Sequence, residues 1–423
     1  MQVYIETFGC STNRHEAEVM AGLIARAGCL IVDSPSLADV IIINVCTVKG
    51  ETKAQRIIRK MSNGYPDKAL VVAGCIPDDY ETLLDIHPAA SMVSTHNISD
   101  IVTAVRKAAK GKQSLLLGKG PRSKVGAPKI RKNSIVSIIP VSTGCNSCCA
   151  YCSVKAIKGD LLSYKKEDLL TEARVSLSNG CKEIWLTSQD TATYGMDLGN
   201  PALPGLITDI CGLPGRFYVR VGMMNPSNVL LILHPLIEAF RDPKVFKFLH
   251  VPLQSASPVI LRKMGRSYSP DEFITIIDAF RKAIPDITIS TDIICGFPTE
   301  TDAQFNESLK MTKLIRPDVM NISRFKARPK TPAALMEQLD SRTIKNRSKQ
   351  MTDLFCRVSK EHNRKWLGWT GEVLVDEAGT AGTSIARNFS YKQVILPGRY
   401  RLGQRLKVRI TAVTSHDLRA EPQ

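Results

Sequence analysis

The sequence of 423 residues has no long hydrophobic run, and its 7 histidines are few. No apolar stretch approaches the about 20 residues of a transmembrane helix, so we expect no membrane span. The start, MQVYIETFGCSTNRHE, lacks the basic and then apolar segments of a signal peptide, which predicts a cytoplasmic protein. In a reducing cytoplasm, the 12 cysteines are expected to be metal ligands or small buried residues rather than disulfide partners.

Acidic residues are scarce relative to basic ones, with 40 Asp and Glu against 57 Lys and Arg and a net charge of +17. This excess favours a polyanionic partner such as nucleic acid, although a merely solvated basic surface would give the same count. Residues 106–132 hold ten basic residues and no acidic one, which indicates a basic linker at 109–132. The linker would join an N-terminal domain (1–108) to a central domain (133–363), which a small domain (364–423) follows.

The N-terminal domain alternates predicted strands and helices, as an open parallel α/β sheet of about four strands does. Cys10, Cys46 and Cys75 each come just after a predicted strand. Because ligands of such sheets bind beyond the carboxyl ends of the strands, we expect these three thiols to converge. Three unrelated buried cysteines are the alternative, and Cys29 fits that description.

The central domain contains six predicted strands, each followed by a helical pattern, which indicates a partial (βα)6 barrel. The strands are expected at 135–144, 183–188, 217–223, 246–253, 287–296 and 319–325. The first is followed by GCNSCCAYC, where Cys145, Cys149 and Cys152 have the spacing C-x3-C-x2-C and Cys148 is the odd one out. Three thiolates are one short of a structural zinc site, and no histidine lies in or beside this stretch. A [4Fe–4S] cluster on three cysteines would keep one iron open for another ligand.

The last domain has short strands of alternating pattern between Gly and Pro turns, which predicts a small barrel of five strands. Its segment RNFSYKQV interleaves basic and aromatic residues, namely Arg387, Phe389, Tyr391 and Lys392. Single-stranded RNA is bound by rings that stack on bases and cations that meet phosphates. A structural barrel with an incidentally basic face is the alternative.

The motifs together resemble the radical S-adenosylmethionine (SAM) methylthiotransferase family over essentially the whole chain. GCNSCCAYCSVKAIKGDLLS is similar to its radical SAM signature, and ETFGCSTNRHEAEVM, NVCTVKGETKAQRIIR and VVAGCIPDD are similar to its three-cysteine domain. HVPLQSASPVILRKMGRSYS and TDIICGFPTETDAQF resemble its barrel, and the C-terminus resembles its TRAM domain. TSQDTATYG and RNFSYKQV look most like the archaeal and eukaryotic branch, which acts on threonylcarbamoyladenosine in tRNA. Two residues depart from the pattern, Ala256 and Cys295, and both are interpreted as packing changes.

The resemblance implies an enzyme with two [4Fe–4S] clusters and SAM as cofactors. Cys145, Cys149 and Cys152 would hold the cluster that binds and cleaves SAM, while Cys10, Cys46 and Cys75 would hold an auxiliary cluster for the inserted sulfur. Cys148 would be a buried bystander. The radical from SAM would remove hydrogen from carbon 2 of the adenine ring, and a methylthio group would replace it.

Further site residues are expected at the ends of the barrel strands. Candidates for contacts with SAM are Gln189, Asp190, Arg220, Gln254, Ser255, Asp292 and Gly296. Arg324, Lys326 and Arg328 are candidates for contacts with RNA phosphate or with the substrate carboxylate. We expect a monomer that depends on an electron donor and a sulfur source, neither of which the sequence identifies.

Three alternatives remain open at this point. The substrate could be isopentenyladenosine in tRNA, or an aspartate of a ribosomal protein. The chain could also be an RNA-binding protein whose clusters are only structural.

Overall fold

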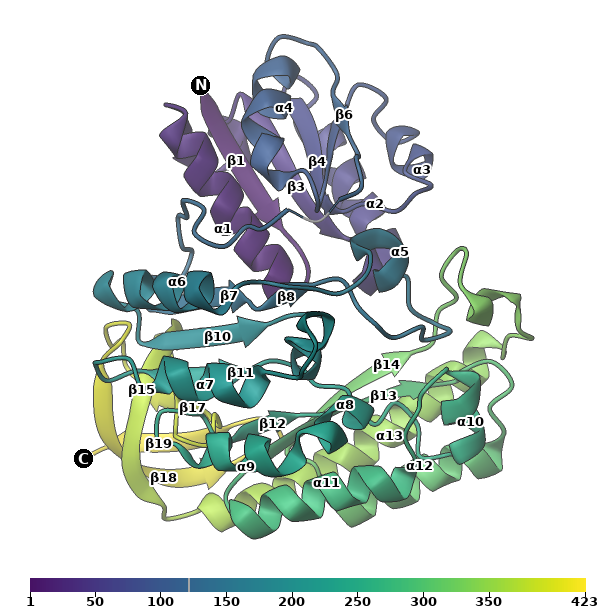
Figure 1. Ribbon diagram of the computed structural model, residues 1–423, viewed down its shortest axis with the longest axis vertical. Helices are drawn as coiled ribbons and strands as arrows, with labels where there is room; N and C mark the ends of the chain where they lie inside the picture. Colours follow the sequence, from purple (N-terminus) through teal and green to yellow (C-terminus); the bar gives the residue numbers. More distant parts are fainter. Residues whose placement is uncertain (121) are drawn as a thin grey trace.

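The computed structural model describes residues 1–120 and 122–423, with the side chains of residues 47–51 excepted. An N-terminal α/β domain lies against one side of a central barrel, and a small β-barrel lies against one end of it (Figure 1). No helix in these described ranges is both long and apolar enough for a membrane span.

The N-terminal domain is a six-stranded parallel sheet in the order β2-β1-β3-β4-β5-β6. Its strands are β1 (Gln2–Thr7), β2 (Leu30–Val32), β3 (Val40–Cys46), β4 (Ala69–Cys75), β5 (Ser91–Ser94) and β6 (Leu115–Leu116). Its helices are α1 (Ser11–Arg26), α2 (Thr47–Gly64), α3 (Glu81–Leu84) and α4 (Ile101–Ala108). Helices α1 and α4 share a core with one face of the sheet, and α2 shares a core with the other.

The sheet has six strands, so the prediction of about four was wrong. Three of the six strands are short: β2, β5 and β6 have only three, four and two residues. Such short segments carry too little alternation to be recognised. Strand β6 also belongs to the segment predicted as a linker, so the sheet continues past residue 108.

The central domain has six parallel strands, as predicted, arranged as two three-stranded sheets. The first sheet is β11-β10-β7 and the second is β12-β13-β14, and a bridge between Val219 and Val245 lies where they meet. The strands are β7 (Val136–Pro140), β10 (Glu183–Thr187), β11 (Tyr218–Val221), β12 (Phe248–His250), β13 (Thr288–Cys295) and β14 (Val319–Arg324). The helices around them are α6 (Lys166–Ser178), α7 (Leu203–Cys211), α8 (Pro226–Leu231), α9 (Leu233–Arg241), α10 (Pro258–Lys263), α11 (Pro270–Ala283), α12 (Asp302–Ile315) and α13 (Ser341–Asn363).

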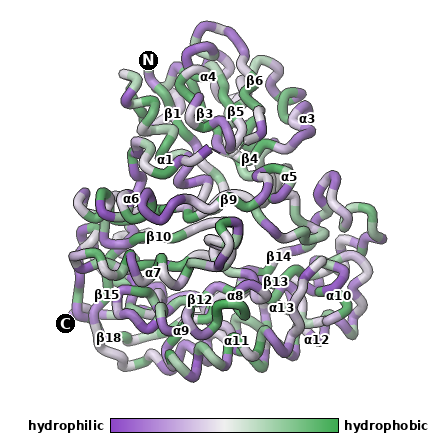
Figure 2. Tube along the Cα trace, viewed as in Figure 1, coloured by the Kyte–Doolittle hydropathy of each residue, from purple (hydrophilic) through white to green (hydrophobic). Residues whose placement is uncertain are grey.

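Two of these helices begin at capping motifs. Ser269 and Glu272 form a capping box at the start of α11, and Thr301 and Gln304 form one at the start of α12. Each box satisfies backbone N–H groups that have no partner inside the helix. Along both helices, apolar and polar residues alternate in short groups (Figure 2), so each helix has one apolar face for the barrel.

The last domain is the predicted five-stranded barrel, closed in the order β15-β16-β17-β19-β18. Its strands are β15 (Thr370–Ala378), β16 (Thr383–Arg387), β17 (Gln393–Pro397), β18 (Arg405–Val413) and β19 (Leu418–Pro422). It contacts the amino ends of the central strands: the N–H of Lys247 donates to the carbonyl oxygen of Phe389, and the hydroxyl of Ser390 donates to that of Asp286. The last domain therefore lies opposite the carboxyl ends of the strands, where the cysteine motif is (Figure 1).

The predicted basic linker contributes buried ion pairs between domains. Lys124 forms an ion pair with Glu16 of α1 at 2.5 Å, and Lys129 forms one with Glu172 of α6. These lysines have little exposed surface, so they are not free to contact RNA. These two lysines of the predicted basic linker instead connect the domains through ion pairs.

Candidate active site between two cysteine groups

The first cysteine group lies at the carboxyl edge of the N-terminal sheet. Cys46 and Cys75 end the neighbouring strands β3 and β4 in register, and Cys10 directly precedes α1. The thiol of Cys46 hydrogen-bonds with those of Cys10 and Cys75, and these bonds together with burial raise its pKa. The sheet thus brings together three cysteines that lie far apart in the sequence.

Asn13 fixes the position of this group. Its side chain is completely buried, and it accepts a hydrogen bond from the thiol of Cys10 at 3.3 Å. Its amide nitrogen donates to the carbonyl oxygen of Val45 at 3.0 Å and lies 3.9 Å from the sulfur of Cys75. His15, which is close to Cys10 in sequence, has its Nδ1 at 3.0 Å from the carbonyl oxygen of Ile138 instead.

The second group follows β7 and the short strand β8 (Ser142–Thr143). Gly144 has a φ of +76°, and a Cβ there would lie 1.8 Å from the carbonyl oxygen of Asp160, so this turn requires glycine. Backbone N–H groups donate to two of the thiols, from Ser147 to Cys145 and from Val154 to Cys152, each at 3.4 Å. Donors of this kind stabilise thiolates and cluster sulfurs.

Burial raises the pKa of Cys145, and it raises that of Cys152 to about 11. Binding of a metal at these positions would release the thiol protons. Cys148 is exposed, which corrects the expectation of a buried bystander. Its sulfur lies 3.8 Å from the ammonium group of Lys155.

Neither group is arranged around a single ion: within the described residues, no three His, Cys, Asp or Glu side chains are placed to hold one metal ion. A [4Fe–4S] cluster makes a different demand, because each of its three cysteines binds a different iron atom. The donor set of each group, three thiols without histidine or carboxylate, suits iron–sulfur ligation.

Two predicted SAM contacts follow β10 and differ in their partners. The carboxylate of Asp190 accepts hydrogen bonds from the N–H groups of Ala192 and Asn225 and from the side chain of Asn228, so it is engaged within the protein. The Oε1 atom of Gln189 is buried without a hydrogen-bond partner in the described structure. Gln189 can therefore accept a bond from a ligand, while Asp190 is placed to hold the surrounding loop.

The predicted SAM contacts on β13 and in the segment before it also differ in their partners. Asp292 accepts a hydrogen bond from Asn321 at 2.5 Å, and its other carboxylate oxygen lies 3.1 Å from Nε2 of His250. Gln254 forms a bridge with Ile293 at a φ of +66°. Ser255 is fully buried and accepts a bond from the N–H of Ser257.

Gly296 directly follows β13 and has a conformation that other residues rarely adopt, with a φ of +76°. A Cβ atom there would lie 2.6 Å from the side chain of Ile344 on α13. The residue therefore allows close packing of α13 against the carboxyl end of the strand.

The segment after β14 lies beside both cysteine groups. Lys326 donates a hydrogen bond to the hydroxyl of Thr52 on α2, the helix that begins directly after Cys46. Arg328 exerts a positive potential on the thiol of Cys152. Arg324 is exposed at the end of β14.

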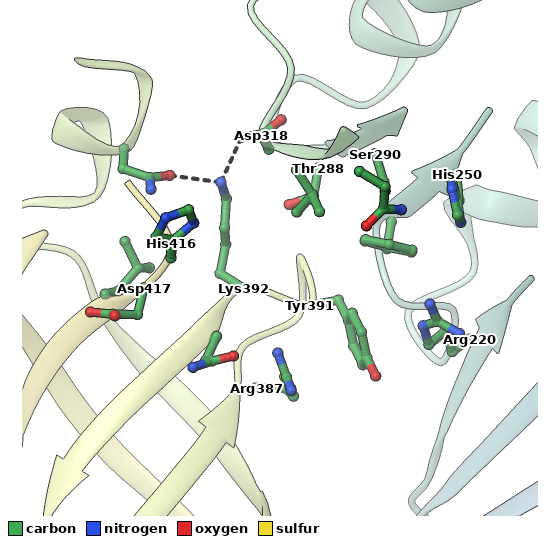
Figure 3. Close-up of a pocket in the computed structure, with 16 residues that line it drawn as sticks. Arg220, His250, Thr288, Ser290, Asp318, Arg387, Tyr391, Lys392, His416 and Asp417 are labelled. Carbon is green, nitrogen blue, oxygen red and sulfur yellow. Dashed lines mark hydrogen bonds and ion pairs between the residues drawn. The ribbon is translucent and has the colours of Figure 1, made fainter. Parts of the chain in front are cut away.

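Arg220 is placed far from these thiols, at the junction of the barrel and the last domain. Its guanidinium lies over the rings of Trp185, Phe248 and Tyr391, at 4.9 to 5.1 Å from their centroids. It lines a cavity of about 300 Å³ to which Arg387, Tyr391 and Lys392 also contribute (Figure 3). The structure does not bring Arg220 to the cysteine motif.

The RNFSYKQV segment is directed into this junction. The Nζ atom of Lys392 lies 2.6 Å from a carboxylate oxygen of Asp318 and 2.7 Å from the side-chain oxygen of Asn363. Arg387 pairs with Asp376 at 2.9 Å, and Phe389 packs near Trp366. These cations and rings contact protein, so the segment does not present the open surface that the sequence suggested.

Two residues near the second cysteine group were not predicted as contacts. Arg266 donates a hydrogen bond to the sulfur of Cys149 at 3.3 Å. Asn225 donates to the hydroxyl of Ser147 at 3.4 Å, and its Oδ1 atom is buried without a partner in the described structure. Arg266 lies in the barrel motif KMGRSYS, which was the available signal, whereas no motif marked Asn225.

Three family models match the chain. They are the radical SAM superfamily at residues 139–312, uncharacterized protein family UPF0004 at residues 2–94, and the TRAM domain at residues 364–422. A solved structure of the radical SAM methyltransferase TsrM from Kitasatospora setae has a similar fold, with a TM-score of 0.56 and 13% identity over 79% of this chain and 75% of that one. The fold and the matches define a radical SAM enzyme with a C-terminal TRAM domain.

Proteins of similar sequence identify the family within this class of enzymes. The probable threonylcarbamoyladenosine tRNA methylthiotransferase of Methanothermobacter thermautotrophicus is 40% identical, over 100% of this chain and 99% of the relative. The threonylcarbamoyladenosine tRNA methylthiotransferase of Danio rerio is 38% identical, over 100% of this chain and 78% of the relative. The chain belongs to this family of methylthiotransferases, whose cofactors are SAM and [4Fe–4S] clusters.

Proposed function

We propose that the protein converts N6-threonylcarbamoyladenosine at position 37 of tRNA to its 2-methylthio derivative. The observation that carries this proposal is the position of the segment after β14. Lys326 bonds to α2, the helix that follows Cys46, and the charge of Arg328 acts on the thiol of Cys152. An adenosine placed between the two groups would lie beside this segment. The names of the relatives support the same substrate.

The modified base carries a negative charge that is complementary to the positive charge of this segment. A threonylcarbamoyl group carries a carboxylate and several hydrogen-bonding groups, whereas an isopentenyl group is apolar. Arg324 is exposed and forms no ion pair within the described residues, so it is available to pair with that carboxylate. A site that pairs a polar group rejects analogues that lack it, because its own groups would be left unpaired.

The two cysteine groups fit the cofactors of the family. Cys145, Cys149 and Cys152 would hold one cluster, with Arg266 and two backbone N–H groups around their sulfurs. Cys10, Cys46 and Cys75 would hold the other. When bound, SAM and the clusters supply the reducing electron, the organic radical and the sulfur.

The protein's own side chains would bind and orient. The partnerless oxygen atoms of Gln189 and Asn225 are suited to accept hydrogen bonds from the amino or hydroxyl groups of SAM. Asp190 would hold the loop that carries them. The protein would work as a monomer in the cytoplasm, supplied by an electron donor and a sulfur source.

The test offers the reconstituted enzyme three tRNAs: one with threonylcarbamoyladenosine, one with isopentenyladenosine and one unmodified. Mass spectrometry of the nucleosides should show a methylthio product from the first alone. Arg324→Ala should lower the rate on that tRNA by about tenfold or more, the loss expected for an unpaired carboxylate. Lys310→Ala, at an exposed lysine of α12, is the matched control and should act normally. A product from the isopentenyl tRNA alone would refute the proposed substrate.

A further inference from the structure

One buried lysine of the barrel reaches across to the N-terminal domain. Lys158 ends α5 (Val154–Lys158), six residues after Cys152, and only 3% of its surface is exposed. Its ammonium group lies 3.0 Å from the hydroxyl of Thr95 and 3.3 Å from a carboxylate oxygen of Glu16. Both partners belong to the N-terminal domain, so this side chain links the second cysteine motif to the domain of the first.

The charges of Lys158 and its buried neighbours do not cancel one another. Glu16 is completely buried and pairs with both Lys158 and Lys124. Burial opposes its ionisation, but the two lysines outweigh burial and lower its pKa to about 2. One carboxylate with two ammonium groups leaves one positive charge in excess. A buried net charge is costly unless a further charge compensates it.

The first cysteine group lies close to this surplus charge. Asn13, one turn before Glu16 on α1, contacts the sulfurs of both Cys10 and Cys75. Lys158 interacts electrostatically with the same two thiols. The surplus positive charge is thus directed at the thiols.

We infer that Lys158 is a positioning residue of the auxiliary cluster, whose buried ammonium group provides the counter-charge for the cysteine thiolates and for the anionic sulfur that the cluster receives. The inference rests on the proposed assignment of Cys10, Cys46 and Cys75 as cluster ligands. The carboxylate of Glu16 neutralises part of this positive charge and holds the ammonium group of Lys158 in place. Lys124 forms the second ion pair with Glu16. Because Lys158 follows the second motif so closely, it also fixes the loop of that motif against the first site.

The experiment isolates the auxiliary cluster in the full chain with Cys145, Cys149 and Cys152 changed to Ala. Inorganic sulfide is titrated into the reconstituted protein, and the reduced cluster is followed by electron paramagnetic resonance. Lys158→Met should weaken sulfide binding about tenfold or more, as expected for removal of a nearby buried charge, and should shift the reduction potential to more negative values. Glu16→Gln enlarges the positive surplus, so it should change both quantities in the opposite direction.

Lys155→Met is the matched control, because this lysine lies on the same helix but is exposed. It should leave sulfide affinity and reduction potential unchanged.

If Lys158→Met binds no auxiliary iron, Lys158→Arg tests whether the charge or the packing is responsible. Recovery of iron by the retained charge supports the inference, and lack of recovery overturns it. The inference would also be overturned if Lys158→Met and Glu16→Gln changed the sulfide affinity and the reduction potential in the same direction. If the two side chains only supported the structure, loss of either one would have the same effect. Retention of auxiliary iron in Cys10→Ala/Cys46→Ala/Cys75→Ala would instead refute the ligand assignment itself.

Discussion

Lys392 of the last domain and Asp318 of the barrel form an ion pair of 2.6 Å, and the Asp318 side chain is completely buried. Burial opposes the ionisation of Asp318, but Lys392, His362 and the N–H of Ile289 outweigh it, so its pKa is lowered. This pair attaches the TRAM domain to the amino end of the barrel.

Removal of one partner of this pair should loosen the attachment. Lys392→Met should cost about 3–5 kcal/mol of unfolding free energy, because it leaves a buried carboxylate without its cation. Denaturant unfolding measures the loss, and Lys407→Met, at an exposed lysine of the same domain, is the control. Adding Asp318→Asn to Lys392→Met should restore part of the stability. No recovery in the double variant would contradict this interpretation.

The cysteine groups should have separable duties. Changing Cys145, Cys149 and Cys152 to Ala should abolish SAM cleavage and leave about half of the iron, because only one of two similar clusters is lost. Changing Cys10, Cys46 and Cys75 should preserve SAM cleavage and stop sulfur insertion. Cys148→Ser, at the exposed thiol, should retain both clusters. Iron analysis, 5′-deoxyadenosine and the methylthio nucleoside are measured. Full methylthio product from the second triple variant would refute the auxiliary role.

The tRNA contacts of the TRAM domain should come from its exposed basic residues and not from the buried segment at 387–392. Arg399, Arg401, Lys407 and Arg409 are exposed. Changing all four to Ala should weaken tRNA binding and lessen the steepness of its log–log salt dependence, by about 0.7 to 0.9 for each phosphate that the protein no longer neutralises. Binding measured at several salt concentrations checks this. SAM cleavage without tRNA should be unchanged, and an unchanged salt slope would exclude this surface.

Glu183 should make the stability depend on pH. Burial, and secondarily the charge of Asp376, raise its pKa to about 8. The folded state therefore holds a proton that the unfolded chain releases near pH 4.5, so this contribution to stability is present below pH 4.5 and is lost as the pH rises to about 8. The loss should be on the order of 1 kcal/mol per pH unit in this window. Glu183→Gln should flatten the profile of unfolding free energy against pH, and an unchanged profile would contradict the assignment.

The sequence predicted the six barrel strands and the closed five-stranded barrel because their apolar patterns are strong and regular. It also predicted that Cys10, Cys46 and Cys75 would lie close together, since strand ends in a parallel sheet share an edge. The role of the two cysteine groups as cluster ligands stays a prediction. It could not show that Arg220 faces the TRAM domain, because position in a strand does not determine which end of a barrel a long side chain reaches. RNFSYKQV was misjudged for a related reason: basic and aromatic residues suit RNA, but they also suit a domain interface with buried acids such as Asp318.

The in-register pairing of Cys46 with Cys75 has a consequence for assembly. Hydrogen bonds of the sheet hold the backbone of these two residues side by side, so little chain entropy would be lost if iron and sulfide bound to their thiols. The proposed auxiliary cluster would therefore enter a preorganised site, and its loss and reassembly would not require refolding of the domain. Recovery of a protein that had lost this cluster would then depend on the supply of iron and sulfide rather than on new protein synthesis.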